Sequence, residues 1–432
     1  MDILHSWGVE LTSHLQTRYS RYEGLFSLAS AVADLHTTFF CLFPVWFYMR
    51  KDTGVRLIWV AVIGDWLNLV LKWVLSGERP YWWVHETQFY GAGKAPSLQQ
   101  FPITCETGPG SPSGHAMGVT GVWYVMVTAL LSIAKEKQCP SLLYSLLQIG
   151  LWTLMVVVVL IVCMSRVFMA AHFPHQVVEG VITGIVVAGM VSKKKWIYSA
   201  SMSKYLLITL FLTFFAIGFY LLLKIVGVDL LWTLDKAQKW CIKPEWIHLD
   251  TTPFASLLRN MGTLFGLGLG LHSSFYHGVK KDANAGFKMG CIMISLFLLH
   301  LLDRWTFSSD NHMTFYILSF GKSAFALLIP TTLIPWALYR IFKGTELDKN
   351  LNNWDFSVFI KQTLTSNFRR RHSTAENNHR EGRTLQTYCV AFLYECPDLW
   401  LDLFDELNKV SIALHHPTRH DEDLSASHWK MR

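Results

Sequence analysis

The sequence predicts an all-α protein, a polytopic membrane bundle of about nine transmembrane helices. The first observation is composition: 51% of the 432 residues are hydrophobic and only 16% are charged, whereas soluble domains carry about 25% charged residues. The second is the recurrence of apolar runs close to the roughly 20 residues that a helix needs to cross a membrane. Because short polar connections separate most of these runs, helices that satisfy their own backbone groups are the economical structure.

The candidate spans follow one another along most of the chain. They lie near residues 25–49, 55–77, 116–134, 143–165, 176–192, 205–225, 254–272, 288–304 and 313–341. Polar residues precede the first run, so we expect that run to be a retained anchor rather than a cleaved signal.

Two parts are expected, a transmembrane domain over residues 1–343 and a cytoplasmic tail over residues 344–432 whose composition is compatible with disorder. The tail carries a basic run, Arg369 to Arg371, that suits a segment near anionic membrane lipid. We assign the tail no catalytic part. The net charge is +7, but no basic stripe is interleaved with aromatic residues, so a nucleic-acid partner is not expected.

Basic residues gather in alternate connections between the spans, which predicts the orientation of the bundle. They are Arg50, Lys51, Arg56, Lys135, Lys137, Lys193, Lys194, Lys195, Lys280 and Lys281. The positive-inside rule places these connections on the cytoplasmic face. The N-terminus then lies on the opposite face, and an odd number of spans puts the C-terminus in the cytoplasm.

The eight cysteines contain no Cys-x-x-Cys pair and no zinc-ligand spacing, so no metal site is expected. Cys41, Cys163 and Cys291 lie in apolar runs and are interpreted as core residues. Cys105 and Cys241 could face an oxidising compartment, but their spacing does not establish a bridge.

Three short motifs carry the candidate chemistry. Lys72 is followed after six residues by Arg79, the run Pro112-Ser113-Gly114-His115 precedes the third span, and Arg166 is followed after five residues by His172. Arg79 follows the second span, and the third motif lies between the fourth and fifth spans. All three therefore reach the non-cytoplasmic face, although the basic residues used for the orientation do not include them.

Each motif also has a simpler structural interpretation. Lys72 or Arg79 alone is often a side chain that extends to lipid headgroups, and a lone His115 is often structural. The unpaired N–H groups of a helix start suit an anion, Gly114 permits close approach, and Ser113 can cap the helix or donate to that anion.

Arg166 has no acidic neighbour in the sequence, so it is expected to bind an anion. A phosphate matches the planar fork of an arginine side chain. Three cations around one phosphoryl group, without a carboxylate set for magnesium, predict charge neutralisation by side chains rather than by metal.

The three motifs together resemble the signature of the superfamily of acid phosphatases, lipid phosphate phosphatases and vanadium haloperoxidases, the PAP2 superfamily. Four longer stretches resemble the glucose-6-phosphatase catalytic subunit family. They are WVAVIGDWLNLVLKWV at 59–74, CETGPGSPSGHAMG at 105–118, AHFPHQVV at 171–178 and DTTPFASLL at 250–258. The resemblance runs from the N-terminus to about Lys343, which makes residues 1–343 the expected phosphatase domain.

The resemblance implies hydrolysis of glucose 6-phosphate to glucose and inorganic phosphate in the endoplasmic reticulum lumen, in support of gluconeogenesis and glycogenolysis. It implies no metal or other cofactor, a covalent phosphohistidine, and a separate glucose-6-phosphate transporter as partner. By the same resemblance His172 is the nucleophile and His115 the proton donor and acceptor. The residues implied to bind phosphate are Lys72, Arg79, Ser113, Gly114 and Arg166.

One departure concerns the residue four positions after the nucleophile, which is Asp in the wider superfamily and Gln176 here. The Gln176 carbonyl or the intramembrane carboxylate of Asp34 could orient the imidazole of His172. His175 lies three residues from His172, but the spacing favours His172 as the nucleophile. The chain also has no Asn-x-Ser/Thr sequon, although related enzymes are usually glycosylated.

Two alternatives stay open at this stage. A lipid phosphate phosphatase would use the same chemistry, but those proteins usually have about six spans and the missing Asp. A weakly active paralogue or a transporter would keep the membrane fold, although the chain shows no internal repeat of the kind that transporters often have.

Overall fold

The computed structural model describes residues 1–91, 95–230, 232–248, 251–273, 285–305 and 312–343. Within these ranges the chain forms helices and no strand, which confirms the all-α prediction. The predicted tail at 344–432 and the basic pair Lys280 and Lys281 lie outside the described residues.

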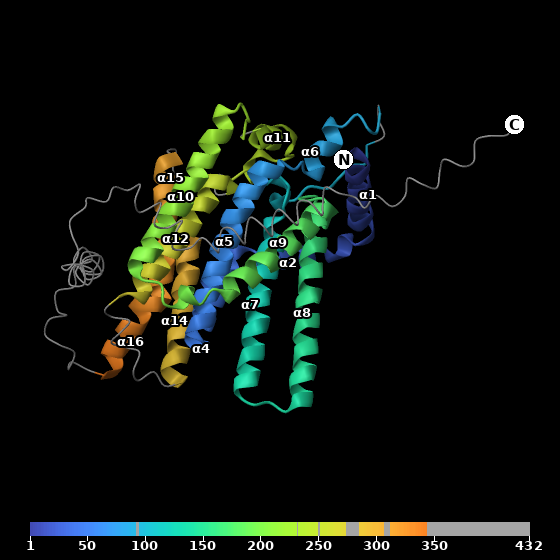
Figure 1. Ribbon diagram of the computed structural model, residues 1–432. Helices are drawn as coiled ribbons and strands as arrows, with labels where there is room; N and C mark the ends of the chain where they lie inside the picture. The colour runs from blue at the N-terminus through green and yellow to red at the C-terminus, as the bar shows by residue number, and fades with distance from the viewer. Residues whose placement is uncertain (92–94, 231, 249–250, 274–284, 306–311, 344–432) are drawn as a thin grey trace, which may run out of the picture. The chain divides into compact units, whose positions relative to one another are not determined.

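The long helices account for most of the described chain (Figure 1). They are α5 (Lys51–Leu75), α7 (Gly114–Glu136), α8 (Ser141–Phe168), α9 (Pro174–Lys193), α10 (Met202–Ile225), α12 (Pro253–Leu271), α14 (Ala285–Arg304) and α15 (His312–Leu328), which continues through η7 (Ile329–Leu333) into α16 (Ile334–Lys343).

Shorter helices complete the described chain. They are α1 (Asp2–Arg18), η1 (Ser20–Tyr22), α2 (Glu23–Val32), α3 (Leu35–Thr37), η2 (Thr38–Leu42), α4 (Phe43–Met49), α6 (Pro80–Glu86), η3 (Pro102–Cys105), η4 (Lys195–Tyr198), α11 (Trp232–Trp240) and η5 (Pro244–Trp246).

The described residues show a multi-pass membrane protein, but the count of nine spans is not confirmed. Among the described residues, seven helical segments are long and apolar enough to cross a membrane. The first predicted span is a pair of segments, Ser20–Val32 and Leu35–Met49, bent by 56°. The run near 254–272 is the helix missing from this count. It forms α12, which includes Arg259, Asn260 and several glycines.

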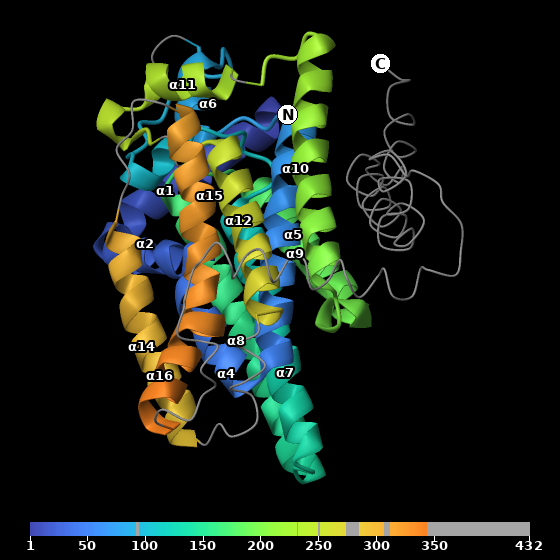
Figure 2. The ribbon, with the colours of Figure 1, turned by 90° about the vertical axis from the view of Figure 1, so that its left-hand side faces the viewer.

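The surroundings of α12 explain its composition. It packs against α15, α5 and α10, which Figure 2 shows around it. Leu257, Met261 and Leu264 are almost fully buried there. A helix enclosed by other helices does not need an apolar surface toward lipid, so a hydropathy count passes over it.

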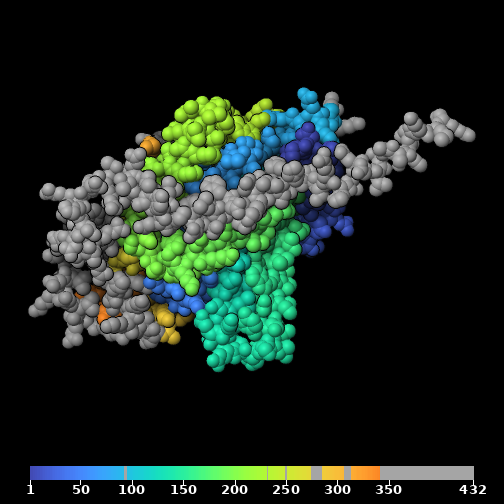
Figure 3. Space-filling model, in the orientation of Figure 1, coloured from blue at the N-terminus to red at the C-terminus, as the bar shows by residue number. Residues whose placement is uncertain are grey.

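Helices α7 and α8 form an antiparallel hairpin that extends beyond the neighbouring described helices (Figures 1 and 3). Only 17% of the apolar 18-residue stretch of α8 is buried inside the protein. Its exposed side chains include Leu143, Leu146, Ile149, Leu154 and Leu160. This composition suits a helix whose outer face contacts lipid tails.

One end of the bundle carries basic residues and an ion pair, and the other end brings together the elements that carry the three motifs. At one end Arg50 forms a bidentate ion pair with Glu136, at 2.6 and 3.2 Å, and so joins the start of α5 to the end of α7. At the other end lie the last turn of α5, the first turn of α7, the turn between α8 and α9, and the short helices α1, α6 and α11.

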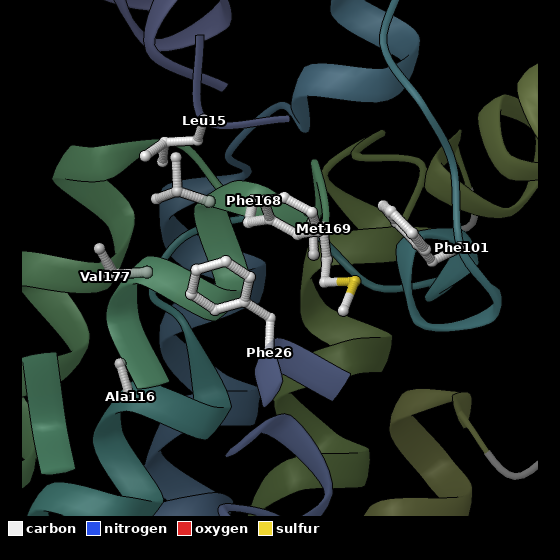
Figure 4. Packing of buried hydrophobic residues seen from close by; sticks show 9 residues of the cluster. Leu15, Phe26, Phe101, Ala116, Phe168, Met169 and Val177 are labelled. Atoms are coloured by element: carbon white, nitrogen blue, oxygen red, sulfur yellow. The ribbon is translucent and has the colours of Figure 1, made fainter. Parts of the chain in front are cut away.

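A hydrophobic cluster holds that second end together (Figure 4). Phe26 of α2 lies against Phe168 of α8 with ring centroids 4.5 Å apart, and Phe101 packs on the same ring at 5.6 Å. Leu15 of α1 and Met169 complete the contact. The cluster fixes the end of α8, from which the following turn departs.

The aromatic residues Tyr81, Trp82 and Trp83 of α6 form part of the packing between the short helices. All three side chains are buried, in a cluster with Val9 of α1 and Phe173. The triplet therefore packs the short helices together instead of anchoring them at lipid headgroups.

Candidate active site

The last turn of α5 and the segment that joins it to α6 carry the first two candidate cations. Lys72 lies in the last turn of α5, and the helix ends at Ser76, which adopts a left-handed conformation with φ 44°. Arg79 is extended and lies just before Pro80 at the start of α6. The helix that carries Lys72 therefore ends before Arg79, and the left-handed turn at Ser76 separates the two cations.

The guanidinium group of Arg79 is fully buried and is held mainly by backbone carbonyls. Its Nε donates to Gly108 O at 2.7 Å, and its terminal nitrogens donate to Ala171 O at 3.1 Å and Pro109 O at 3.4 Å. The first and third of these acceptors precede the α7 motif, and Ala171 precedes His172. Arg79 thus joins all three motifs of the sequence.

Glu106 is the main residue that sequence reasoning missed. Its Oε2 accepts from Arg79 Nη1 at 3.1 Å, and its Oε1 accepts from Arg166 Nη2 at 2.7 Å. The Nδ1 atom of His115 lies 3.9 Å from the same Oε1. Burial favours the neutral acid, but Arg166 and Arg79 outweigh it and hold the pKa of Glu106 well below its usual value.

The guanidinium group of Arg166 is also held by a residue of α2. Its Nη1 donates to Ser30 Oγ at 2.9 Å, and the neighbouring Ser165 Oγ donates to Phe26 O at 2.7 Å. The anion expected beside Arg166 is thus partly supplied by the protein, through Glu106, 60 residues upstream. The Nε of Arg166 is buried and has no hydrogen-bond partner among the residues that the structure describes.

His172 lies in the tight turn between α8 and α9, which contains the left-handed residue Ala170 with φ 52°. Its Nδ1 is 2.8 Å from Gly110 O, so this nitrogen carries the proton and donates to the carbonyl. The lone pair is then on Nε2, which is buried and has no partner in the described chain. Burial, followed by Arg79 and Arg166, holds the pKa of His172 well below its usual value.

The orienting group of His172 is therefore the Gly110 carbonyl and neither candidate from the sequence. The carbonyl of Gln176 accepts from Ser113 N at 3.0 Å, and its side chain donates to Glu78 O at 2.7 Å. Gln176 thus fixes the α7 motif instead of the imidazole. Asp34 caps α3 by accepting from His36 N at 2.8 Å, and it is exposed.

The first turn of α7 presents the second imidazole. Ser113 is at the N-cap position but makes no side-chain capping bond, and its buried Oγ has no partner within the described ranges. The next residue, Gly114, lies against Asn68, whose Oδ1 would be 3.1 Å from an added Cβ. His115 follows, and its Nε2 is also buried without a partner.

Several side chains of the three motifs share an unusual feature, a buried polar atom without a hydrogen-bond partner. Buried polar atoms in native proteins almost always have such a partner. Four buried atoms of the motif residues have no partner within the described part of the chain: Ser113 Oγ, His115 Nε2, Arg166 Nε and His172 Nε2. Together they offer a hydroxyl, two imidazole nitrogens and a guanidinium N–H beside further cations. Such a set can bind a tetrahedral oxyanion and exchange protons with it.

His175 belongs to a different environment from His172. Its ring stacks with Phe173 and with His5 of α1, at centroid distances of 5.7 and 5.5 Å. His5 stacks on the same Phe173 at 4.3 Å. The histidine next to the candidate nucleophile is therefore part of the contact between α1 and the start of α9.

A strap formed by residues 232–248 is fastened to the segment that contains Glu106. Cys105 and Cys241 form a disulfide, which settles the pairing that the sequence left open. Beside it, Thr233 Oγ1 donates to Thr107 O at 2.7 Å.

The strap also holds α6, which Arg79 precedes. Trp232 packs edge-on against Trp82 with ring centroids 5.9 Å apart, and Lys236 pairs with Glu86. The strap is therefore attached both to the segment that contains Glu106 and to the helix that follows Arg79.

The fold and the site define a membrane phosphatase of the PAP2 class. A profile described as the PAP2 superfamily matches residues 53–200, which include Lys72, Arg79, His115, Arg166 and His172. The chain belongs to the glucose-6-phosphatase catalytic subunit family, as its relatives show.

The chain is 75% identical over 352 residues to glucose-6-phosphatase catalytic subunit 1 of Haplochromis nubilus, covering 81% of this chain and 100% of that protein. It is 54% identical over 345 residues to the protein of the same name from Canis lupus familiaris, covering 79% and 97%. It is 46% identical over 348 residues to glucose-6-phosphatase 2 of Mus musculus, covering 79% and 98%. No solved structure matches the chain significantly.

Proposed function

We propose that the protein hydrolyses glucose 6-phosphate to glucose and inorganic phosphate through a covalent phosphohistidine. The observation that carries the proposal is the set of buried, unpartnered polar atoms on Ser113, His115, Arg166 and His172. A phosphoryl group supplies oxygens for the donors and an electrophilic phosphorus for the lone pair of His172. Family membership gives the sugar phosphate as the substrate class.

In the first step the Nε2 lone pair of His172 attacks phosphorus, and the bond from phosphorus to the sugar oxygen breaks. The Gly110 carbonyl keeps the other ring nitrogen protonated, and it stabilises the positive charge that develops on the ring. His115 Nε2 gives its proton to the departing oxygen, so glucose leaves as a neutral alcohol. Lys72, Arg79 and Arg166 neutralise the phosphoryl oxygens in a buried site, where such charges act strongly.

In the second step water attacks the phosphorus of the phosphohistidine. His115, now neutral, takes a proton from that water, and the bond between phosphorus and Nε2 of His172 breaks. Inorganic phosphate leaves, and both imidazoles return to their starting states. Ser113 and the first N–H groups of α7, starting at Gly114, donate to the phosphoryl oxygens in both steps.

The proposed location is the endoplasmic reticulum membrane, with the N-terminus and the site lumenal. Arg50, Lys51, Lys135 and Lys193 lie at the opposite ends of α5, α7 and α9 from the site, which supports this orientation. A disulfide beside the site fits an oxidising compartment. A glucose-6-phosphate transporter would then supply the substrate, and the reaction would serve gluconeogenesis and glycogenolysis.

Membranes that contain the full chain test the proposal with three substrates at equal concentration: glucose 6-phosphate, mannose 6-phosphate and phosphatidate. We expect release of phosphate chiefly from glucose 6-phosphate, in intact vesicles only when the substrate can reach the lumen. The variant His172→Ala is the control and should release none. Preference for phosphatidate would instead identify a lipid phosphate phosphatase.

A further inference from the structure

We propose that Glu106 occupies part of the phosphate site in the resting enzyme, and that the substrate displaces its carboxylate from the two arginines toward His115. Glu106 is then a positioning residue with two partners in succession. The inference rests on the proposed phosphatase function. It gives a role to Glu106, which belongs to none of the three short motifs.

The hydrogen bonds of Arg79 show why displacement is needed. Three of its contacts are to the backbone carbonyls of Gly108, Pro109 and Ala171, and the fourth is to Glu106. The carbonyls are fixed by the chain, so the carboxylate is the contact that can be exchanged. Arg166 makes its own bond to the second oxygen of Glu106, at 2.7 Å.

One carboxylate therefore fills the space between two guanidinium groups, with one oxygen on each. Apart from the Nε of Arg166, which has no partner among the described residues, a phosphoryl group held by both arginines competes with Glu106 for the same N–H groups. Phosphate offers three oxygens and a greater charge than a carboxylate, so it is the stronger partner for two guanidinium groups. Glu106 and a phosphate dianion together balance the three positive charges of Lys72, Arg79 and Arg166.

His115 is the nearest second partner. Its Nδ1 is 3.9 Å from Oε1 of Glu106, just beyond a hydrogen bond, so a small rotation of the side chain closes the gap. The backbone on either side stays in place, because Cys105 is bonded to Cys241 and the Thr107 carbonyl accepts from Thr233. A carboxylate on Nδ1 would hold His115 with Nε2 toward the sugar oxygen and would stabilise its imidazolium form.

The test compares wild type with Glu106→Gln in membranes that contain the full chain, using orthovanadate as the phosphate-like probe. Removal of the competing charge should tighten vanadate inhibition about tenfold, close to the net worth of one charge-assisted hydrogen bond. Loss of the second contact should lower kcat for glucose 6-phosphate about 100-fold, the lower end of general acid catalysis. KM should not rise.

Two further variants sharpen the comparison. Glu106→Asp keeps the charge but is too short to reach both arginines, so vanadate should again inhibit more tightly, with kcat between wild type and Glu106→Gln. Glu136→Gln removes the carboxylate of a glutamate–arginine pair at the far end of α7, which Glu136 forms with Arg50. It should leave both vanadate inhibition and kcat unchanged.

Weaker or unchanged vanadate inhibition in both Glu106 variants would overturn the proposal, because the carboxylate would then only support the arginines. The thermal shift that vanadate causes in each detergent-solubilised protein compares vanadate binding to wild type and to the Glu106 variants without any need for turnover. The two proposals therefore fail separately: a wild type that binds vanadate but does not hydrolyse glucose 6-phosphate contradicts the proposed function alone.

Discussion

The contact between α7 and α9 gives the most demanding prediction, because a single methyl group there should disturb the catalytic geometry. Gly180 of α9 faces the first turn of α7. A Cβ at this position would lie 2.5 Å from Ser113 O and 3.1 Å from the Cβ of Ala116. The nearer atom belongs to the backbone, so it cannot rotate away.

The size of the disturbance follows from these distances. An ordinary contact begins at 3.4 Å, so Gly180→Ala must separate the two helices by about 0.9 Å at this point. Ser113 and His115 move with α7, whereas His172 stays with the start of α9. A misplacement of about 1 Å can cost about 100-fold in rate, while overpacking costs about 1–3 kcal/mol of stability.

The assay is kcat/KM for glucose 6-phosphate in membranes, with the thermal midpoint of the solubilised protein measured alongside. Gly150→Ala is the matched control, because Gly150 lies on the exposed face of α8 and an added Cβ meets nothing within 4 Å. We expect a loss of at least tenfold for Gly180→Ala and none for Gly150→Ala. Wild-type activity in Gly180→Ala would refute the claim that this glycine sets the spacing of the two imidazoles.

Three further predictions concern the nucleophile and the strap. His172→Ala should abolish labelling of the protein by radioactive phosphate from the substrate, and His175→Ala should retain detectable labelling; the reverse pattern would reassign the nucleophile. Because burial and then Arg79 hold the pKa of His172 well below its usual value, the imidazole stays neutral as the pH falls. Phosphoenzyme formation in the first turnover should therefore persist from pH 7 to about 5.5, whereas a loss centred near the ordinary histidine value of about 6.5 would contradict this electrostatic account. Replacing Cys105 and Cys241 together by Ser should lower the stability by about 2–5 kcal/mol, the usual contribution of a native disulfide. It should also lower kcat/KM. Unchanged values of both would show that the strap does not position Glu106.

The sequence was sufficient to predict that the three motifs meet. Helix length and the alternation of basic connections place Arg79, His115 and Arg166 at one end of the bundle, because each apolar run must cross the same thickness of membrane. Motif spacing then selects His172 over His175, and the structure does place His175 in a stack with His5.

The partners of these residues could not be predicted in the same way. Glu106 is one acid in a stretch rich in Gly and Pro, and only the folded chain brings it between two arginines 27 residues upstream and 60 residues downstream. The carbonyl of Gly110 carries no sequence signal at all, because every residue has one. A resemblance based on side chains therefore directs attention to Gln176 and Asp34, which have other partners.

The span count shows a second limit. Apolar composition identifies helices that face lipid, such as α8, better than helices enclosed by protein. In α12, Asn260 and Ser256 donate to Asp65 of α5, so polar side chains stabilise the contact between two helices. Hydropathy alone cannot separate such a helix from a polar connection.

The most direct test of the central claim is an experimental structure of the full chain with bound orthovanadate. The account predicts vanadium bonded to Nε2 of His172, with Arg79 and Arg166 on its oxygens and His115 Nε2 at the oxygen on the opposite side. Vanadate bound at His175, or bound with either arginine on a different side of the bundle, would contradict it.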